Sequence, residues 1–173
     1  MVNILADFSI QIIERFIELV SAPIIHTEML WIMSPFLISV ILTEIYYSRY
    51  KEEKTEWGSS LENSTVLLFV SLDLLRYLYI YDLFYVNIQL SLVFALIFVG
   101  VFLFILDYFH ALPPDIGLVI SSKAPLNFLA LIVLLMVYTN TLLDSYTIGA
   151  ILILMVLFYM VLTIIHWITP KNG

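Results

Sequence analysis

Residues 57–81 read WGSSLENSTVLLFVSLDLLRYLYIY, a stretch long enough to cross a bilayer as a helix. The same stretch carries Glu62, Asn63, Asp73 and Arg76. Charged side chains inside a membrane span are costly, so they usually pair with each other or take part in function. The stretch therefore indicates an integral membrane protein and is the first place to look for a site.

The composition supports the same interpretation. Of the 173 residues, 62% are hydrophobic and 12% are charged, whereas a soluble domain is about half apolar and a quarter charged. Spanning strands would alternate apolar and polar residues, and runs such as LSLVFALIFVGVFLFIL (residues 90–106) do not alternate. We therefore predict an all-α, polytopic membrane helix bundle, with residues 1–173 forming a single membrane domain.

The hydrophobic runs predict about five transmembrane helices. We place these helices at about residues 28–47, 60–81, 85–110, 126–143 and 147–167. Residues 3–20 differ, because polar and apolar side chains alternate there with helical periodicity. They predict an N-terminal amphipathic helix that lies in the membrane interface and ends at Pro23; the alternative is that this helix packs beside its own bundle.

Two connections between the predicted spans stand out. Residues 48–58 (SRYKEEKTEWG) form the only strongly polar run, and we expect a solvated loop. Residues 111–125 (ALPPDIGLVISSKAP) contain an apolar segment that is too short to span. This segment is either a short interfacial or re-entrant helix or an ordinary loop with an apolar anchor.

Lysine and arginine predict the orientation, because cytoplasmic loops are enriched in them. With five spans, one side of the membrane receives Arg49, Lys51, Lys54, Lys123 and Lys171. The other side receives only Arg15 and Arg76. We therefore expect the N-terminus outside and the C-terminus in the cytoplasm, an assignment that would change if residues 3–20 also spanned.

Charge and cysteine content restrict the partners and the chemistry. The net charge of −7 argues against binding nucleic acid, which needs a basic surface, and against a polybasic anchor. The chain has no cysteine, which excludes disulfides, thiolate metal sites and cysteine nucleophiles. The expected partners are the lipid bilayer and either another membrane protein or a second copy of the chain, and we expect no cofactor.

One face of the predicted helix 60–81 carries a polar stripe formed by Glu62, Thr65, Asp73 and Arg76. Asp73 and Arg76 are three residues apart and can pair, whereas Glu62 lies about 16 Å from Asp73 along the axis. In one interpretation the pair neutralises itself and Glu62 lies near headgroups. In the others, the stripe lines a polar cavity or an ion path, or a partner subunit supplies the missing charge.

Asp107, His110 and Asp115 form a second candidate site. Carboxylate and imidazole ligands at this spacing could hold a divalent cation. The alternative is that Asp107 and His110 are interfacial groups at a helix end. Glu44 and Glu62 fall on the same predicted side, which would also allow a cytoplasmic acidic cluster.

The sequence carries no strong enzymatic signature. It lacks His-Glu-x-x-His, Gly-x-Ser-x-Gly and a glycine-rich phosphate loop. We therefore expect a non-enzymatic small membrane subunit or scaffold. The alternatives are a small-ion or proton transporter that uses the polar stripe, and a lipid-active enzyme that uses the region around His110.

Overall fold

The computed structural model describes residues 2–49, 57–85, 87–111, 113 and 123–169. Every regular element among them is helical. The elements are α1 (Val2–Ile25), the 3₁₀ turn η1 (Thr27–Met29), α2 (Leu30–Arg49), α3 (Trp57–Ile80), α4 (Ile88–Tyr108), α6 (Lys123–Thr139) and α7 (Ser145–Ile168). The prediction of an all-α chain is confirmed for this part of the chain.

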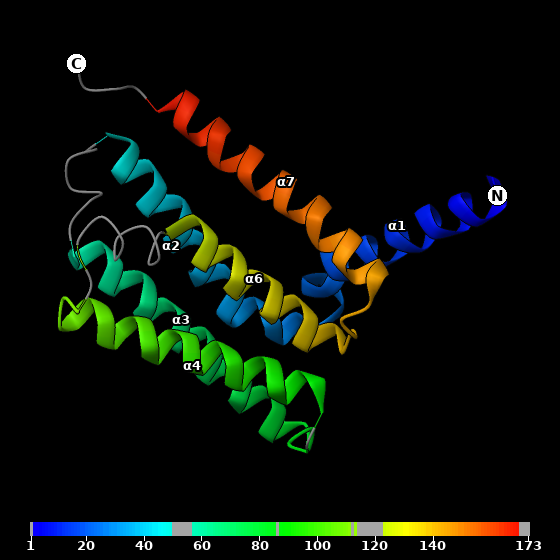
Figure 1. The fold of residues 1–173 in the computed structure, drawn as a ribbon, viewed down its shortest axis with the longest axis horizontal. Coiled ribbons are helices and arrows are strands. Elements are labelled where there is room, and N and C mark those ends of the chain that lie inside the picture. Colours follow the sequence, from blue (N-terminus) through cyan, green and yellow to red (C-terminus); the bar gives the residue numbers. More distant parts are fainter. Residues whose placement is uncertain (1, 50–56, 86, 112, 114–122, 170–173) are drawn as a thin grey trace.

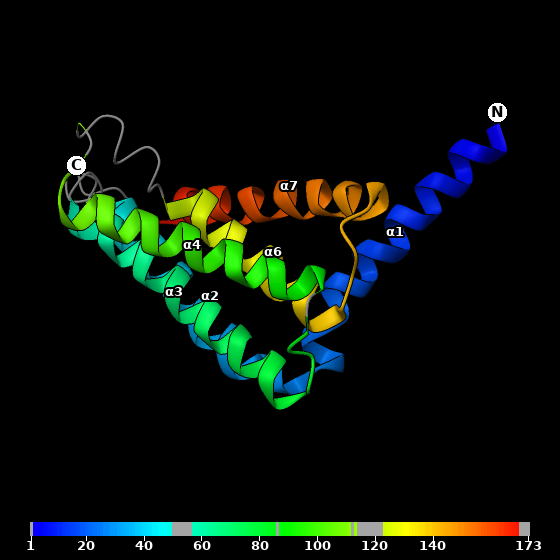
Figure 2. The same ribbon diagram turned by 60° about the horizontal axis from the view of Figure 1, so that its bottom comes forward.

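Helices α2, α3, α4, α6 and α7 lie side by side and alternate in direction along the chain (Figure 1). One end of the bundle therefore holds the start of α2 and the end of α3, and the opposite end holds the end of α2 and the start of α3. Helix α1 contacts α6 and α7 and then projects beyond the first end at a steep angle (Figure 2).

Four segments in the described part of the chain are long and apolar enough to cross a membrane. They are Thr27–Tyr46, Ser60–Ile80, Ile88–Tyr108 and Ser145–Ile168, and they correspond to four of the five predicted spans. The remaining predicted span, at about residues 126–143, is the 17-residue helix α6, which begins and ends a few residues earlier than predicted. At 1.5 Å per residue α6 is only about 25 Å long.

Helix α6 is the centre of the molecule. It contacts α1, α3, α4 and α7, and residues 130–138 are buried without interruption. A helix that is apolar on all sides needs surroundings without water, and neighbouring helices provide them for residues 130–138. Its last buried residue, Tyr138, lies at the same end of the bundle as the start of α2.

The prediction that Pro23 ends the first helix is wrong, because α1 continues to Ile25. Proline lacks the backbone N–H that would bond to the carbonyl four residues earlier, but in the last turn it interrupts little of the helix that follows. Leu19 and Ala22, in the same turns, are completely buried against the bundle. This packing offsets the lost hydrogen bond.

Three helices end on a non-glycine residue with a left-handed backbone. Asp82, His110 and Asn140 have φ values of 54°, 49° and 53° and follow α3, α4 and α6. Aspartate, asparagine and histidine are the residues that tolerate this conformation best after glycine. In each case the next N–H returns to a carbonyl five residues earlier, as from Thr141 to Met136 (3.2 Å), which closes the helix end.

Candidate functional site

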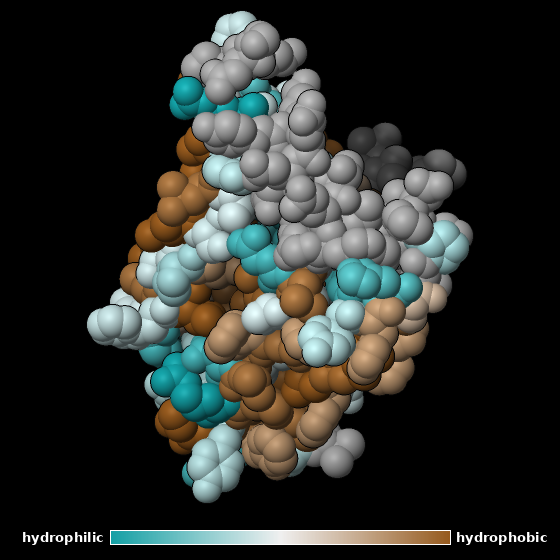
Figure 3. Space-filling model, turned by 90° about the vertical axis from the view of Figure 1, so that its left-hand side faces the viewer, coloured by the Kyte–Doolittle hydropathy of each residue, from teal (hydrophilic) through white to brown (hydrophobic). Residues whose placement is uncertain are grey.

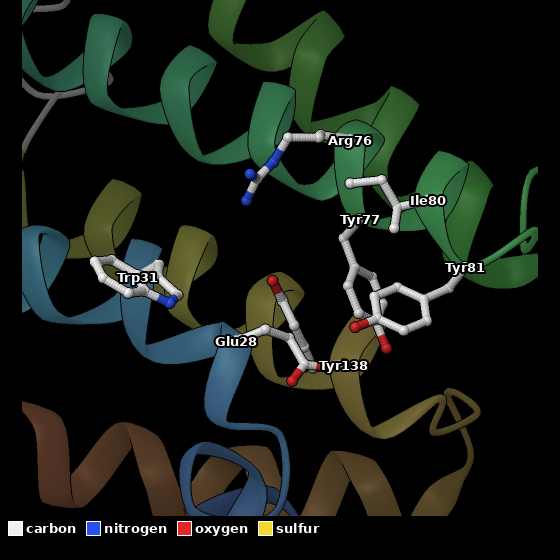
Figure 4. Close-up of a pocket in the computed structure, with 7 residues that line it drawn as sticks. All are labelled: Glu28, Trp31, Arg76, Tyr77, Ile80, Tyr81 and Tyr138. Carbon is white, nitrogen blue, oxygen red and sulfur yellow. The ribbon is translucent and has the colours of Figure 1, made fainter.

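A crevice separates α2 from α3 at the end of the bundle where α2 begins. These two helices touch over only a short stretch, whereas α3 packs along the length of α4. A cavity of about 300 Å³ fills the gap. Its walls come from η1 and α2, from the last turns of α3 with the residue that follows, and from α6; they are Glu28, Trp31, Arg76, Tyr77, Ile80, Tyr81 and Tyr138 (Figure 4).

Charged and phenolic groups meet in this cavity. Arg76 reaches from α3 toward Trp31 of α2, and the three tyrosines gather beside Glu28 (Figure 4). The ring of Tyr77 lies between its neighbours, with centroid distances of 4.0 Å to Tyr138 and 4.8 Å to Tyr81. The packed rings fix the cavity wall that faces Glu28.

Asp73 and Arg76, the two residues of the predicted stripe that line the crevice, form an ion pair. The Arg76 guanidinium donates to Oδ1 of Asp73 at 2.5 Å, and the Arg76 side chain is 61% exposed. Oδ2 of Asp73 is buried and accepts no hydrogen bond from the described residues. Glu28 makes no ion pair within the described part of the chain, so its carboxylate faces the cavity without a basic partner from these residues.

A second, more open cavity of about 490 Å³ continues the crevice toward the middle of α3. It shares Trp31 and Arg76 with the first cavity and adds mainly apolar side chains, which are Ile32, Phe69 and Leu72, together with Asp73. Phe69 and Leu72 are exposed on the outer surface of the bundle. The crevice therefore has a polar compartment at the helix ends and, next to it, a mainly apolar groove that opens sideways.

The structure does not bring the whole predicted stripe to this crevice. Glu62 is exposed near the opposite end of α3, about 16 Å from Asp73 along the helix axis. The Thr65 hydroxyl donates to the carbonyl of Leu61 in its own helix at 2.7 Å. Of the four residues of the predicted stripe, only Asp73 and Arg76 line the crevice.

The second predicted site is only partly described. Asp107 is buried near the end of α4, while His110 is exposed in the left-handed position that ends this helix. Asp115 lies outside the described residues. Within the part of the chain that the structure describes, no three His, Asp or Glu side chains are grouped closely enough to hold a metal ion.

A buried ion cluster that the sequence analysis missed lies at the opposite end of the bundle. Glu44 of α2 contacts His166 of α7 through Oε1 (2.6 Å) and Lys123 of α6 through Oε2 (3.3 Å). The side chains of Glu44 and Lys123 are only 5% and 10% exposed. Glu62 is not part of this contact, so Glu44 lies in a mixed cluster of acidic and basic side chains that joins three helices, and not in an acidic cluster with Glu62.

Other polar side chains are buried at the same end, around the ion cluster. They come from α2, α3, α4 and α6 and are Ser48, Ser60, Asn63, Ser64, Asp107 and Asn127. Figure 3 views this end from outside, where hydrophilic patches interrupt hydrophobic helix flanks. The apolar residues 130–137 of α6 lie between this polar layer and the crevice.

Comparison with known proteins adds no assignment to this geometry. No protein-family model matches the chain, and neither a curated protein nor a solved structure matches it significantly. The crevice and the buried ion cluster must therefore be interpreted from their own chemistry.

Proposed function

We propose that the chain is a membrane protein with five spans and one interfacial helix. Four helices have the length and apolarity of a span, and α6 runs among them in the bundle. Arg49 and Lys123 lie at one end of the bundle, which we assign to the cytoplasm by the enrichment of basic residues there. This orientation places α1 and the crevice on the outer side.

The side chains of α1 support an interfacial position. Leu19 and Ala22 face the bundle, and the opposite sector of α1 exposes large apolar residues, which are Ile10, Ile13, Ile17, Val20 and Ile24. Gln11, Glu14 and Glu18 fall on the remaining sector. A helix with one wet sector and one broad apolar sector is suited to the boundary between headgroups and acyl chains.

We propose that the protein is a non-enzymatic membrane protein that binds an amphiphile in the crevice between α2 and α3. The observation that carries this proposal is that the two cavities adjoin, since Trp31 and Arg76 line both of them. A polar head would occupy the compartment beside Glu28, and a chain would lie in the groove along Phe69 and Leu72. The cavity of about 300 Å³ is at the lower end of the size range of ligand sites in proteins.

The same geometry supports an ion path less well. A path across the bundle would have to connect the crevice with the Glu44 cluster, and the side chains of residues 130–137 between them are apolar and buried. Water is poorly stabilised in such surroundings because it needs two to four polar partners. Binding from the side, through the open groove, requires no such connection.

The proposal is tested by crosslinking with an alkyl amphiphile that carries a photoreactive diazirine in its chain. We expect crosslinks to residues 28–32 and 69–81 that disappear when excess unlabelled amphiphile is added, because a site saturates. Crosslinks to the exposed residues Leu152 and Val156 of α7 serve as the matched control for unspecific lipid contact. If competition reduces both sets equally, the crevice is not a binding site.

A second candidate function is that of a subunit that docks onto another membrane protein through α1. The exposed apolar residues of α1 repeat at intervals of three and four, the spacing that packs one helix against another. Affinity purification from the native membrane of the wild type and an Ile13→Asn/Ile17→Asn variant tests this function. A partner lost only in the variant would support docking, and identical sets of co-purifying proteins would refute it.

A further inference from the structure

The charges around the crevice are unbalanced. The two cavities are lined by two carboxyl groups, Glu28 and Asp73, and by one guanidinium group, Arg76. Arg76 is already engaged by Asp73. Glu28 therefore leaves one negative charge that the described residues do not compensate. A ligand group of positive charge would restore the balance.

Aromatic rings surround the position where that charge would be placed. Tyr77, Tyr81 and Tyr138 line the cavity beside Glu28, and Trp31 lines it from α2 (Figure 4). The faces of such rings attract cations, most strongly those of tryptophan, and several rings together recognise substituted ammonium groups. Tyr77 and Tyr138 are buried, so on their side of the cavity the attraction to Glu28 is stronger than at an open surface.

We infer that the crevice selects an amphiphile whose head is a substituted ammonium ion. This inference rests on the proposed amphiphile binding and adds the charge and type of the head group. The ammonium lies between Glu28 and the aromatic rings, and the alkyl chain follows Phe69 and Leu72. A head that carries only negative charge is disfavoured because it would be repelled by Glu28.

Two sources could supply such a head, a choline- or ethanolamine-type phospholipid and a single-chain amine. They differ in the phosphate, which could reach the exposed part of Arg76. Dodecylphosphocholine and dodecyltrimethylammonium represent the two sources. We expect Arg76→Gln to weaken binding of dodecylphosphocholine and not that of dodecyltrimethylammonium if the phosphate is recognised. Equal effects on both would assign the site to the ammonium head alone.

The test uses the fluorescence of Trp31 in a protein that carries Trp57→Phe and Trp167→Phe, so that Trp31 is the only tryptophan. The protein, in uncharged alkyl maltoside micelles, is titrated with dodecyltrimethylammonium and with dodecyl phosphate. We expect a saturable change of Trp31 fluorescence with at least tenfold tighter binding of the ammonium compound. Glu28→Gln should weaken this binding at least tenfold, and Glu62→Gln, on the exposed far end of α3, should not change it.

Tyr81→Leu is a second variant, because Tyr81 is half exposed and its replacement does not disturb the core. We expect this variant to weaken binding of the ammonium compound and Tyr81→Phe to preserve it. Equal binding by the wild type and Glu28→Gln, or tighter binding of dodecyl phosphate, would overturn the inference while leaving amphiphile binding intact. If no amphiphile changes Trp31 fluorescence in a saturable way, the proposed function itself is wrong.

Discussion

Replacing Glu44 with leucine tests whether the buried ion cluster holds three helices together. Glu44 contacts both Lys123 of α6 and His166 of α7. The substitution leaves the Lys123 side chain, only 10% exposed, without its carboxylate partner from α2. Removing one member of a buried ion pair costs about 3–5 kcal/mol, because the remaining charge stays in a poorly hydrated place. His166 is 40% exposed, so water can replace most of its contact with Glu44. Losing this contact therefore costs only about 0–1 kcal/mol.

Two further variants separate charge from hydrogen bonding. Glu44→Gln keeps an acceptor for His166 and loses the charge, so we expect a smaller loss, of about 1.5–3 kcal/mol. The double variant Glu44→Leu/Lys123→Met removes both charges and should recover most of the loss, because apolar residues often replace a buried ion pair without cost. Glu62→Gln, a change at an exposed glutamate of α3, is the control and should stay within about 0.5 kcal/mol of the wild type.

The free energy of unfolding can be measured in mixed micelles with increasing dodecyl sulfate, followed by far-ultraviolet circular dichroism. The order of stability that we expect is wild type, Glu44→Gln, Glu44→Leu, with the double variant above Glu44→Leu. The ion cluster does not hold the three helices together if Glu44→Leu costs less than about 1 kcal/mol, or if adding Lys123→Met lowers the stability further.

Three further predictions concern the ends and crossings of the helices. Asp144 caps α7 by accepting a hydrogen bond from the N–H of Thr147, which lowers the pKa of its carboxyl below the ordinary 3.8. The resulting stabilisation is present above this ordinary pKa and is lost as the pH falls through the lowered pKa. Asp144→Ala should cost about 0.5–2 kcal/mol in unfolding at neutral pH, whereas Asp144→Asn should keep the cap and remove this acid dependence. A Cβ at Gly149 would lie 2.8 Å from Cδ1 of Ile12, so Gly149→Val should destabilise the contact of α1 with α7 by about 1–3 kcal/mol. Ile12→Ala should restore this contact. Cysteine crosslinking between the two helices measures both effects. Asn140→Val should cost about 1–2 kcal/mol in thermal unfolding because of the left-handed backbone there, whereas Asn140→Gly should cost nothing.

The helices were predictable because apolar length and turn chemistry are local properties. The runs at residues 60–81 and 85–110 appear as α3 and α4 with ends shifted by a few residues. The pairing of Asp73 with Arg76 was also predictable, since side chains three residues apart on a helix are neighbours. The packing of the helices was not predictable. Every predicted span is apolar, and the periodicity of the sequence does not indicate which helix lies at the centre of the bundle.

The ion cluster and the crevice depend on contacts between distant parts of the chain. Glu44, Lys123 and His166 lie on three helices that are far apart in the sequence. The available signal was that Glu44 and Lys123 were predicted on the same side of the membrane. The crevice carried less signal still, because tyrosines near the ends of spans usually indicate a membrane interface.

An experimental structure of the protein in lipid nanodiscs, with dodecyltrimethylammonium added, would show whether the crevice binds an amphiphile. We expect density for one amphiphile between α2 and α3, with its head beside Glu28 and its chain along Leu72. Side chains of Trp31 and Arg76 that meet and close the crevice, with amphiphiles only around the outside of the bundle, would contradict it.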